Sequence, residues 1–387
     1  MGGAETWLME VLKLWHVAQG NSPKVDFLAT GGEPGVFDDE ARALGARIHY
    51  VPYSRRNLPA FTRAFRALLQ SGDYDAVHNH AAYSSGWHFL LGGKFLPSVR
   101  VTHVHNPAYT IRKNSDFTFS RRVAAWIGKL LVARYATHIT GTSRQILSEY
   151  GFDEPRFRHI PKGALHCGFD PARFLGNPTL EKQALCQEFG WPGEARILLF
   201  AGRTDRSPCF GHPLNHKNSR FGVEVGILCA QRDPHIHMLF AGARSPAVPL
   251  LEARIAEAGL SRRMVFTGIR RDIERLMLAS DVLLFPSRAE GLGMVAVEAQ
   301  AAGLPVIASA AVPRECVVVP ELVNFLAVDG DPEPWASVVQ TCLAIGRTEV
   351  AYANALVRAS AFAIQNSAAA LERLYSGQAS ALSMAPS

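Results

Sequence analysis

The sequence predicts an α/β protein with two Rossmann-like, doubly wound domains, and three features of the chain predict it. First, apolar segments of strand length alternate with helical segments through the first half. Second, this alternation stops around residues 161–174, where Gly, Pro and short apolar residues predominate. Third, the same alternation starts again and continues to about residue 308. Alternating strands and helices are typical of parallel sheets, so two such runs indicate two domains in tandem.

The first half contains five candidate strands and a clear amphipathic helix. The helix is expected at residues 58–70, where Phe61, Phe65 and Leu68 recur at helical spacing. The expected strands are residues 25–29, 47–51, 76–79, 99–104 and 138–140. These elements define a first domain at residues 1–165, with the segment 161–174 as the interdomain linker.

The second half repeats this order of elements and adds helices at its end. The expected strands are residues 197–201, 236–241, 264–267, 282–285 and 306–308. The second domain is expected at residues 166–349, followed by an Ala-rich helix at 350–375 and a flexible tail at 376–387. In open α/β sheets, ligands bind beyond the carboxyl ends of the strands, so the functional residues should lie there.

The composition is that of an ordinary globular protein. The 387 residues are 48% apolar and 19% charged, which is enough for two domains with separate cores. No segment approaches the ~18 uncharged apolar residues of a membrane span, and no secretory signal is recognisable. The six cysteines are scattered without metal-binding spacing. We therefore expect a cytoplasmic protein with reduced thiols and without structural zinc.

Charge is distributed unevenly between the two halves. Residues 1–165 hold 20 Lys and Arg against 13 Asp and Glu, whereas residues 166–387 hold 20 against 21. A basic first domain indicates an acidic partner, such as an anionic lipid surface or a polyphosphate-linked acceptor. Nucleic acid is disfavoured, because no basic run is interleaved with aromatic residues.

The segment at residues 281–309 carries the most functional information. A buried strand is expected first, then the loop Glu290-Gly291-Leu292-Gly293, then a helix that ends near Gly303 and a second strand. Glu298 lies in the first turns of that helix. Free backbone N–H groups at the helix N-terminus suit a phosphate, and the two carboxylates suit the hydroxyls of a sugar or a ribose.

The acid pair, the Gly-x-Gly loop between the two acids and the flanking strands resemble the signature of retaining GT-B glycosyltransferases of family 4, the group 1 glycosyltransferases. The resemblance implies two Rossmann-like domains that face a crevice, and a nucleotide-sugar donor, most commonly a UDP- or GDP-sugar. It also implies that neither a metal nor another cofactor is needed. In that family the first acid contacts the donor sugar and the second the ribose, so these roles fall to Glu290 and Glu298, with Gly291, Leu292 and Gly293 also at the donor.

Three further stretches narrow the resemblance to one branch of the family. His78-Asn-His80, the segment at residues 100–106 and the segment at residues 320–326 are similar to stretches of capsular and exopolysaccharide glycosyltransferases. This branch implies a saccharide or lipid-linked saccharide acceptor, in capsule, exopolysaccharide or O-antigen-type biosynthesis.

Two cations are expected to bind the donor diphosphate. Arg203 follows the strand at residues 197–201, and Lys217 is expected to open the next helix. A leaving diphosphate needs fixed positive charge, which side chains must supply where no metal does. The family places an arginine and a lysine here, but with a shorter loop between them. We treat residues 204–216 as a surface insertion and keep Arg206 as the alternative second cation.

Histidines mark the expected site of the first domain. His103 and His105 lie two residues apart near the end of a strand, so their side chains project to the same side. The resemblance assigns the family's active-site histidine to His105, which would orient the donor sugar or the acceptor rather than attack it. His80 and His103 are candidates for the acceptor side. The alternative for each is a packed, hydrogen-bonded histidine.

The start of the chain departs from the family pattern. Gly2-Gly3-Ala4-Glu5 resembles the family's glycine loop, so Gly3 is a candidate for donor contact and Gly2 for acceptor contact. In the family this loop follows the first strand, whereas here Met1 precedes it, and that strand is apparently missing. Its loss would leave an edge or a gap in the sheet. A catalytically impaired GT-B protein that acts as a partner or scaffold is therefore the alternative function.

Two features allow two interpretations each, and one competing class is disfavoured. Arg270 matches a family segment at the nucleotide base and would either stack on the base or be solvated. The amphipathic segment at residues 120–135 suits either a membrane surface or ordinary packing on the sheet. A dinucleotide-dependent oxidoreductase is disfavoured, because the chain lacks Gly-x-Gly-x-x-Gly at a strand-to-helix turn.

Overall fold

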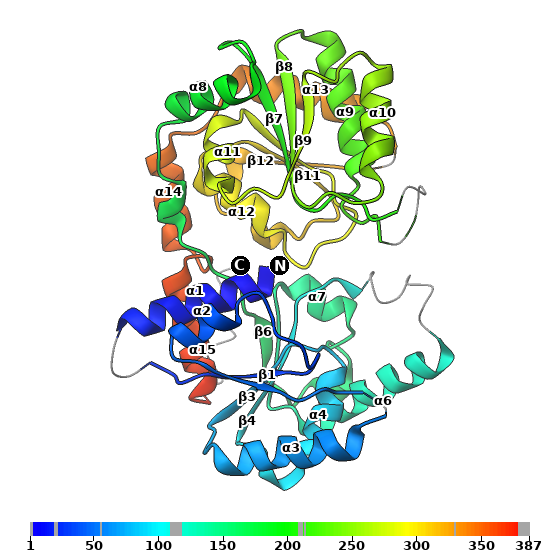
Figure 1. Ribbon diagram of the computed structural model, residues 1–387, viewed down its shortest axis with the longest axis vertical. Coiled ribbons are helices and arrows are strands. Elements are labelled where there is room, and N and C mark those ends of the chain that lie inside the picture. Colours follow the sequence, from blue (N-terminus) through cyan, green and yellow to red (C-terminus); the bar gives the residue numbers. More distant parts are fainter. Residues whose placement is uncertain are drawn as a thin grey trace. The chain divides into compact units, whose positions relative to one another are not determined.

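A computed structural model describes residues 3–18, 22–54, 56–108, 118–207, 212, 214–328 and 330–377. The chain divides into two compact units. Unit 1 consists of the described residues up to Ala108, those from 118 to Phe169, and those from Ala361 onward. Unit 2 contains Asp170–Ser360. Each unit is an α/β body built on parallel strands (Figure 1).

Unit 2 is a regular doubly wound domain. Its strands are β7 (Arg196–Ala201), β8 (Ile236–Ala241), β9 (Met264–Gly268), β10 (Val282–Phe285), β11 (Val306–Ser309) and β12 (Val323–Leu326). Its helices are α8 (Pro178–Phe189), α9 (Ser219–Arg232), α10 (Val248–Glu257), α11 (Ile273–Ala279), α12 (Met294–Ala301), α13 (Glu333–Ile345) and α14 (Val350–Ala359), with short 3-10 turns at Pro171–Phe174, Arg314–Cys316 and Pro320–Leu322.

The strand order of unit 2 identifies its ligand-binding edge. The order is β12-β11-β10-β7-β8-β9, and every neighbouring pair is parallel. This is the Rossmann order, which runs outward in both directions from its first and fourth strands. The topological switch point therefore lies between β7 and β10, where helices leave to opposite faces of the sheet. A ligand is expected beyond the carboxyl ends of these two strands.

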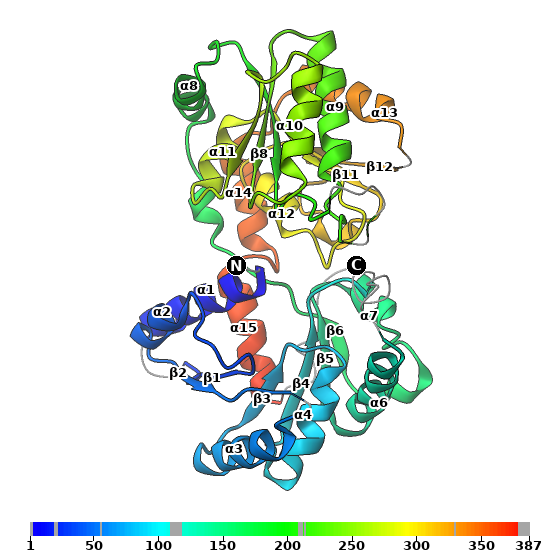
Figure 2. The same cartoon turned by 45° about the vertical axis from the view of Figure 1, so that its right-hand side comes forward.

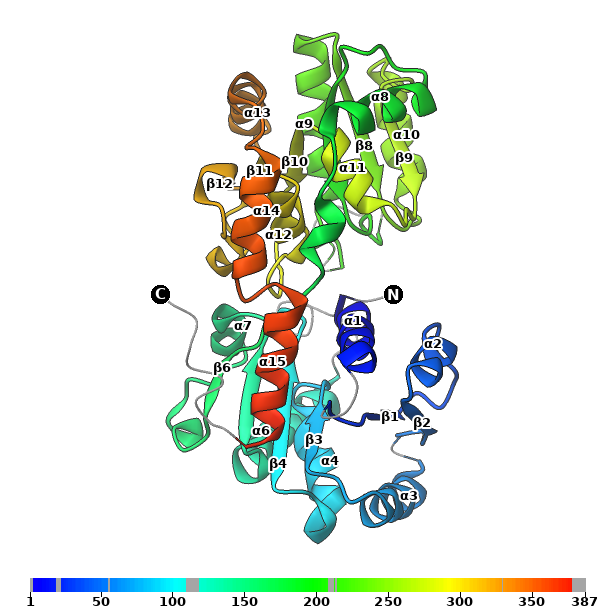
Figure 3. The ribbon, with the colours of Figure 1, turned by 90° about the vertical axis from the view of Figure 1, so that its left-hand side faces the viewer.

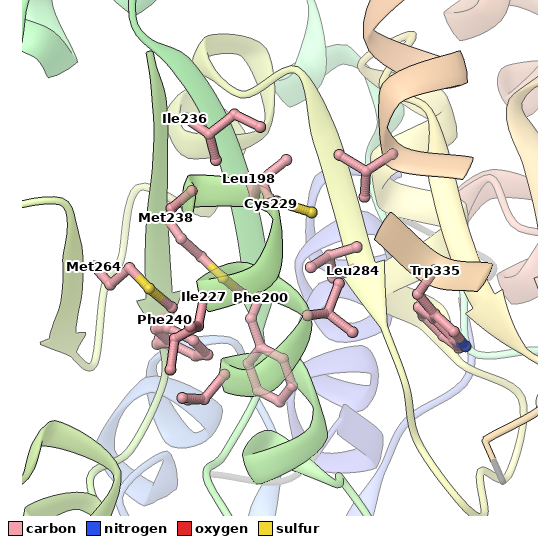
Figure 4. Packing of buried hydrophobic residues seen from close by; sticks show 14 of the residues in the cluster. Leu198, Phe200, Ile227, Cys229, Ile236, Met238, Phe240, Met264, Leu284 and Trp335 are labelled. Carbon is pink, nitrogen blue, oxygen red and sulfur yellow. The ribbon is translucent and has the colours of Figure 1, made fainter. Parts of the chain in front are cut away.

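The core of unit 2 lies where the sheet meets α9, α10 and α13. Figure 2 shows α9 and α10 side by side along β8, and Figure 4 shows side chains from the sheet and from α9 and α13 packing together. Leu198, Phe240 and Trp335 are at most 1% exposed. Because both faces of the central strands are covered, these strands are almost entirely apolar. Such continuous apolar segments are easy to recognise in the sequence.

Unit 1 contains the remaining strands and helices. The strands are β1 (Asp26–Ala29), β2 (Arg47–Tyr50), β3 (Ala76–Asn79), β4 (Val99–Val104), β5 (His138–Gly141) and β6 (Lys162–Ala164). The helices are α1 (Gly3–Ala18), α2 (Asp38–Ala43), α3 (Leu58–Ser71), α4 (Ser84–Gly92), α6 (Phe119–Tyr135), α7 (Arg144–Glu149) and α15 (Ile364–Tyr375), with 3-10 turns at Gly93–Phe95 and Pro155–Phe157.

The sheet of unit 1 is divided. β1 and β2 pair in parallel as a two-stranded sheet, and β3-β4-β5-β6 form a separate parallel sheet of four strands. The first described element is the helix α1. α15 returns from the far end of the sequence and packs beside α1 (Figure 3). Trp7 Nε1 donates to Ser367 Oγ at 2.8 Å, which ties these two helices together.

The boundaries of the predicted domains need correction. Residues 162–164 form β6, so the segment expected as a linker supplies an edge strand, and the units divide at Phe169. The expected single helix at residues 350–375 is two helices, α14 in unit 2 and α15 in unit 1. β12 was not among the expected strands. Within the tail, residues 378–387 lie outside the described part.

Free thiols are present at Cys167, Cys186, Cys229, Cys316 and Cys342. In the described part of the chain, no helix has both the length and the apolar character needed to cross a bilayer.

Candidate functional site

The switch point of unit 2 carries the charged residues that the sequence singles out. Arg203 follows β7 by two residues, and Glu290 follows β10 by five. Lys217 Nζ donates to Glu290 Oε1 at 2.6 Å, and their side chains are 23% and 11% exposed. The sequence places these residues far apart, and the parallel strands bring them to one edge of the sheet. The topology thus gathers two of the predicted donor residues into an ion pair.

Arg203 lies in the electrostatic field of this ion pair. Burial lowers the pKa of its guanidinium, the nearby Arg206 lowers it further, and Glu290 raises it. Its Nε is buried and makes no hydrogen bond. An unpaired donor on a half-buried cation can bind an anion without breaking an existing contact.

The loop after Glu290 is shaped by one glycine. Gly293 has φ +93°, and a Cβ there would lie 2.8 Å from the Phe285 ring and 3.0 Å from Val312. Leu292 is 3% exposed and anchors the loop in the core. The backbone therefore passes close to the end of β10 and enters α12 directly. The first N–H groups of α12 stay near the switch point, as the sequence predicts.

Glu298 is the second acid of the predicted pair. It lies in the second turn of α12 and is partly buried. Burial raises the pKa of its carboxyl to about 7, while Arg173 opposes the shift and Glu274 adds to it. A carboxyl group that is half-ionised near neutral pH is unusual for glutamate and is often found at functional sites.

The loop at residues 204–216 is not simply a surface insertion, which corrects the prediction. Thr204 and Asp205 are at most 5% exposed, and Asn215 is 9% exposed. Asn215 Nδ2 donates to the Ser207 carbonyl at 2.7 Å and Oδ1 accepts from Ser207 N at 2.9 Å, closing the base of the loop. Both ends of this segment are therefore buried and hydrogen-bonded. Residues 208–211 and 213 lie outside the described part.

His216, at the end of this loop, was missed by the sequence analysis. Its backbone carbonyl accepts from Arg288 N at 2.6 Å, while its Nδ1 is buried without a partner. Burial lowers the pKa of its imidazole to about 4, and Lys217 lowers it further. His216 is thus a neutral ring next to the Lys217–Glu290 pair. Its position directly before Lys217 was the available signal.

Asp205 explains the placement of Lys217. The Asp205 carboxylate accepts from Asn218 N at 2.9 Å, at the start of α9. Asn218 itself adopts a left-handed conformation with φ 57°. Lys217 therefore precedes α9 by two residues instead of opening it, and its side chain is directed to Glu290.

Arg270 is not a solvated loop residue. Its guanidinium donates to Asp272 at 2.7 and 2.8 Å and to Glu188 at 2.5 Å, and its side chain is 18% exposed. These carboxylates raise its pKa further. Stacking on a nucleotide base stays a prediction, but the guanidinium plane is already held in place.

The predicted histidines of unit 1 lie together with a fourth. His80 Nδ1 lies 2.7 Å from His105 Nε2, and His78 Nε2 lies 3.1 Å from His103 Nδ1. The His103 and His105 ring centroids are 3.9 Å apart. Burial lowers the pKa of all four imidazoles, to about 4 for His80. We call His78, His80, His103 and His105 the histidine cluster.

The glycine loop expected at the start of the chain is a helix in the structure. Gly3 is the first residue of α1, and Gly2 lies outside the described residues. α1 places Trp7 against the histidine cluster, 5.8 Å from the His103 ring centroid. The donor and acceptor contacts of Gly3 and Gly2 stay predictions.

The amphipathic segment of unit 1 is the helix α6. Gly128 faces α4 so closely that a Cβ would lie 2.4 Å from the Tyr83 carbonyl oxygen. On the opposite face, Phe119 is 82% exposed, Trp126 59% and Val123 38%. Helical geometry places these three side chains on one stripe. The ordinary packing interpretation accounts for the Gly128 face but not for the stripe.

Each unit thus gathers its own predicted residues. Unit 2 holds Arg203, Lys217 and Glu290 at the switch point, with Glu298 on the following helix. Unit 1 holds His80, His103 and His105 in the histidine cluster, to which the structure adds His78.

Two family descriptions match the chain. "Glycosyl transferases group 1" matches residues 196–344, and "Glycosyl transferase 4-like domain" matches residues 2–163. The putative glycosyltransferase EpsF of Bacillus subtilis is 27% identical over 380 residues, which cover 97% of this chain and 93% of EpsF. A D-inositol 3-phosphate glycosyltransferase of Xylanimonas cellulosilytica is 27% identical over 408 residues, covering 97% of this chain and 91% of the relative.

The solved structures show the same architecture. Alr3699/HepE of Anabaena in complex with UDP aligns with a TM-score of 0.76 and 19% identity, covering 97% of this chain and 96% of that one. The same protein in complex with UDP-glucose aligns with a TM-score of 0.73. At this identity the similarity shows the fold, which is GT-B.

Proposed function

Since the chain belongs to the group 1 glycosyltransferases, which are GT-B enzymes of family 4, we propose the reaction that it catalyses. It transfers a sugar from a nucleotide diphosphate donor to a saccharide or lipid-linked saccharide, with retention of the anomeric configuration. The pathway is capsule, exopolysaccharide or O-antigen-type biosynthesis. The similarity to EpsF and the histidine stretches of the sequence support this branch.

One observation carries the proposal: Lys217 and Glu290 form an ion pair at the switch point of a Rossmann-ordered sheet. Both ends of this pair suit a sugar nucleotide. The ammonium group can bind the diphosphate, and the carboxylate can accept hydrogen bonds from the sugar hydroxyls. Lys217 and Glu290 neutralise each other in this ion pair, and the donor would insert its own charge and hydroxyls between them. Arg203, with its unpaired Nε, supplies the second fixed cation.

These cations suit a reaction without a divalent metal. The transition state places growing negative charge on the departing diphosphate, which preorganised cations stabilise most. Lys217 is held by its bond to Glu290, Arg203 is half-buried, and the N–H groups at the start of α12 add a positive dipole end. We propose that the departing phosphate takes the proton of the acceptor hydroxyl on the same face of the sugar. No protein nucleophile is then needed.

We assign Glu298 to binding of the nucleotide's ribose, and we propose that the nucleotide is a uridine nucleotide. A glutamate with a pKa of about 7 can bind both ribose hydroxyls once it is ionised. Among UDP and GDP donors we favour UDP, because Alr3699/HepE binds UDP and UDP-glucose.

The acceptor side falls to unit 1. His105 would orient the reacting sugar, with His80 and His103 on the acceptor side, and all three are uncharged imidazoles at neutral pH because burial lowers each pKa. Neutral rings can donate or accept hydrogen bonds to saccharide hydroxyls without attracting counterions.

The exposed stripe of α6 favours attachment to an anionic membrane surface, where a lipid-linked acceptor would be found. Arg122 and Arg134 are exposed and flank the stripe of Phe119, Val123 and Trp126 on its two sides. Aromatic side chains with flanking cations are typical of helices that lie in a membrane interface. Each surface cation adds about 1 kcal/mol at an anionic leaflet, so binding should weaken as salt rises.

Vesicle co-sedimentation tests this attachment. We expect binding to anionic vesicles, little binding to neutral ones, and loss at high salt. Trp126→Ser should reduce binding, and so should Arg121→Glu combined with Arg122→Glu. Ile345→Ser removes an apolar side chain that is 80% exposed in unit 2 and serves as the matched control. Equal binding to anionic and neutral vesicles would favour a soluble acceptor.

The alternative, a catalytically impaired scaffold protein, is favoured by the divided sheet and the helical glycine segment of unit 1. A thermal-shift screen with UDP-, GDP-, ADP- and dTDP-sugars separates donor binding from its absence, because a ligand at 100 times its Kd adds about 2.7 kcal/mol of stability. Donor hydrolysis or transfer that persists in EDTA would support the enzyme. Donor binding without either reaction would support the scaffold.

A further inference from the structure

The histidine cluster contains more imidazole groups than the proposed reaction uses. His78 lies on β3 and His80 directly follows it, while His103 lies on the neighbouring strand β4 and His105 directly follows that strand. The two strands are parallel and in register, with Asn79 opposite Thr102, so the next residues on each strand face the same region. Two His-x-His pairs at the carboxyl ends of adjacent strands therefore converge on one point.

The ring nitrogens are already close to the separation that a shared metal ion imposes. Zn²⁺ binds imidazole at about 2.0–2.1 Å, so two nitrogens on one tetrahedral ion lie roughly 3.3 Å apart. His78 Nε2 and His103 Nδ1 are 3.1 Å apart. One nitrogen each from His78, His80 and His103 lie within 4.8 Å of one another. Small rotations of the partly exposed His80 ring would complete a three-nitrogen set.

The cluster also has an orienting group of the kind that metal sites use. Tyr375, on α15, places its hydroxyl 2.8 Å from His78 Nδ1. When His78 donates its Nδ1 proton to that hydroxyl, the lone pair of Nε2 is free and faces His103. A second hydrogen bond of this type fixes the tautomer and orientation of a metal-binding histidine. Trp7 covers the His103 ring from the side, which limits its rotation.

We propose that His78, His80 and His103 form a site for a divalent transition-metal ion such as Zn²⁺, with an open fourth position. Three imidazole nitrogens suit Zn²⁺, Ni²⁺, Co²⁺ or Cu²⁺, and not Mg²⁺ or Ca²⁺, which prefer oxygen ligands. The bound ion takes up a ring nitrogen of His80, whose ring centroid lies 4.9 Å from that of His105. The ion thereby blocks the acceptor side, and it has no part in the transfer reaction.

Metal binding to the untagged full chain, after treatment with a chelating resin, tests the site without any substrate. Titration of Zn²⁺ against a chromophoric chelator should show one tightly bound ion per chain, and Co²⁺ should give the intense visible bands of a tetrahedral ion. His80→Ala and His78→Gln should each weaken binding by at least tenfold. Tyr375→Phe, which removes only the orienting hydroxyl, should weaken it by about 10–100-fold.

A control and two contrary outcomes complete the test. His159→Ala removes an exposed histidine of unit 1 whose ring contacts the Ala133 carbonyl, and should leave binding unchanged. Absence of stoichiometric Zn²⁺ binding by the wild-type chain would overturn the proposal. So would equal affinity in the wild type, His80→Ala and Tyr375→Phe. Because no sugar donor is present, failure here is separate from failure of the proposed glycosyl transfer.

Discussion

Units 1 and 2 both alternate strands and helices, but they differ in whether the strands form one continuous sheet. Unit 2 has one six-stranded sheet in the Rossmann order, whereas unit 1 divides its strands into a pair and a group of four. The residues of β7, β8, β10 and β11 are nearly all buried, whereas β1 and β3 are only partly buried along their length. The regular sheet presents an ion pair at its switch point, and the divided one presents neutral imidazoles. The charged residues thus lie in the unit with the more completely built sheet, and preorganisation has most value for charged groups.

The largest expected effect is a loss of turnover when a cation at the charged site of unit 2 is replaced. Arg203→Ala and Lys217→Ala should each lower turnover by about 10²–10³, the loss typical of one preorganised group at a developing charge. Steady-state kinetics with the preferred donor measure this. Arg206→Ala is the control, because Arg206 is exposed and is the alternative cation. A normal Lys217→Ala with a crippled Arg206→Ala would reverse the assignment.

Replacing one helical glycine in each unit by alanine compares how tightly helices pack in the two units. A Cβ at Gly128 of α6 would lie 2.4 Å from a backbone oxygen, whereas one at Gly222 of α9 would lie 3.2 Å from the Phe200 ring. Gly128→Ala should therefore destabilise the protein by about 1–3 kcal/mol. Gly222→Ala should be close to neutral, since alanine gains up to about 1 kcal/mol in a helix. Urea unfolding measures both, and equal losses would show that the close contact of α6 with α4 relaxes.

The smallest expected effect is a pH dependence of nucleotide affinity, which arises from Glu298 in unit 2. Burial raises the pKa of Glu298 to about 7, so its carboxyl is mostly protonated at pH 6 and mostly ionised at pH 8. Because the ionised form accepts hydrogen bonds from both ribose hydroxyls, nucleotide affinity should rise over this range by up to about tenfold. The Glu298→Gln variant should not show this rise in affinity. Because both proteins are measured with the same nucleotide, the ionisation of the phosphate contributes equally to both and cancels in the comparison. A parallel rise in both proteins would exclude Glu298 as its source.

The sequence predicted five of the six described strands in each unit, and burial explains which strand was missed. Strands buried on both faces must be apolar throughout, so β7, β8 and β10 are visible as runs. β12, with Asn324 exposed in its middle, and the three-residue β6 lack that pattern. The glycine segment at Gly3 was matched to a loop through the family, whereas in the structure Gly3 is the first residue of α1.

The site residues were predictable where a motif fixed them and not where the fold created the contact. Arg203, Glu290 and His105 follow strands, and a position at a strand end can be read from sequence. The Lys217–Glu290 pair, the approach of Tyr375 to His78 and the buried edge of His216 depend on segments that only the folded chain brings together. Residues 204–216 read as a polar insertion, because hydrogen bonds such as that between Asn215 and Ser207 leave no periodic signal.

Calorimetry of two variants with two ligands tests the central claim most directly, namely that unit 2 divides the donor between Glu290 and Glu298. Glu298→Ala should weaken both free UDP and the UDP-sugar by about 1.5–3 kcal/mol, the contribution of a charged hydrogen bond. Glu290→Ala should weaken the UDP-sugar and leave free UDP nearly unchanged. Unchanged affinity for UDP in Glu298→Ala, or equal losses for both ligands in Glu290→Ala, would contradict the account.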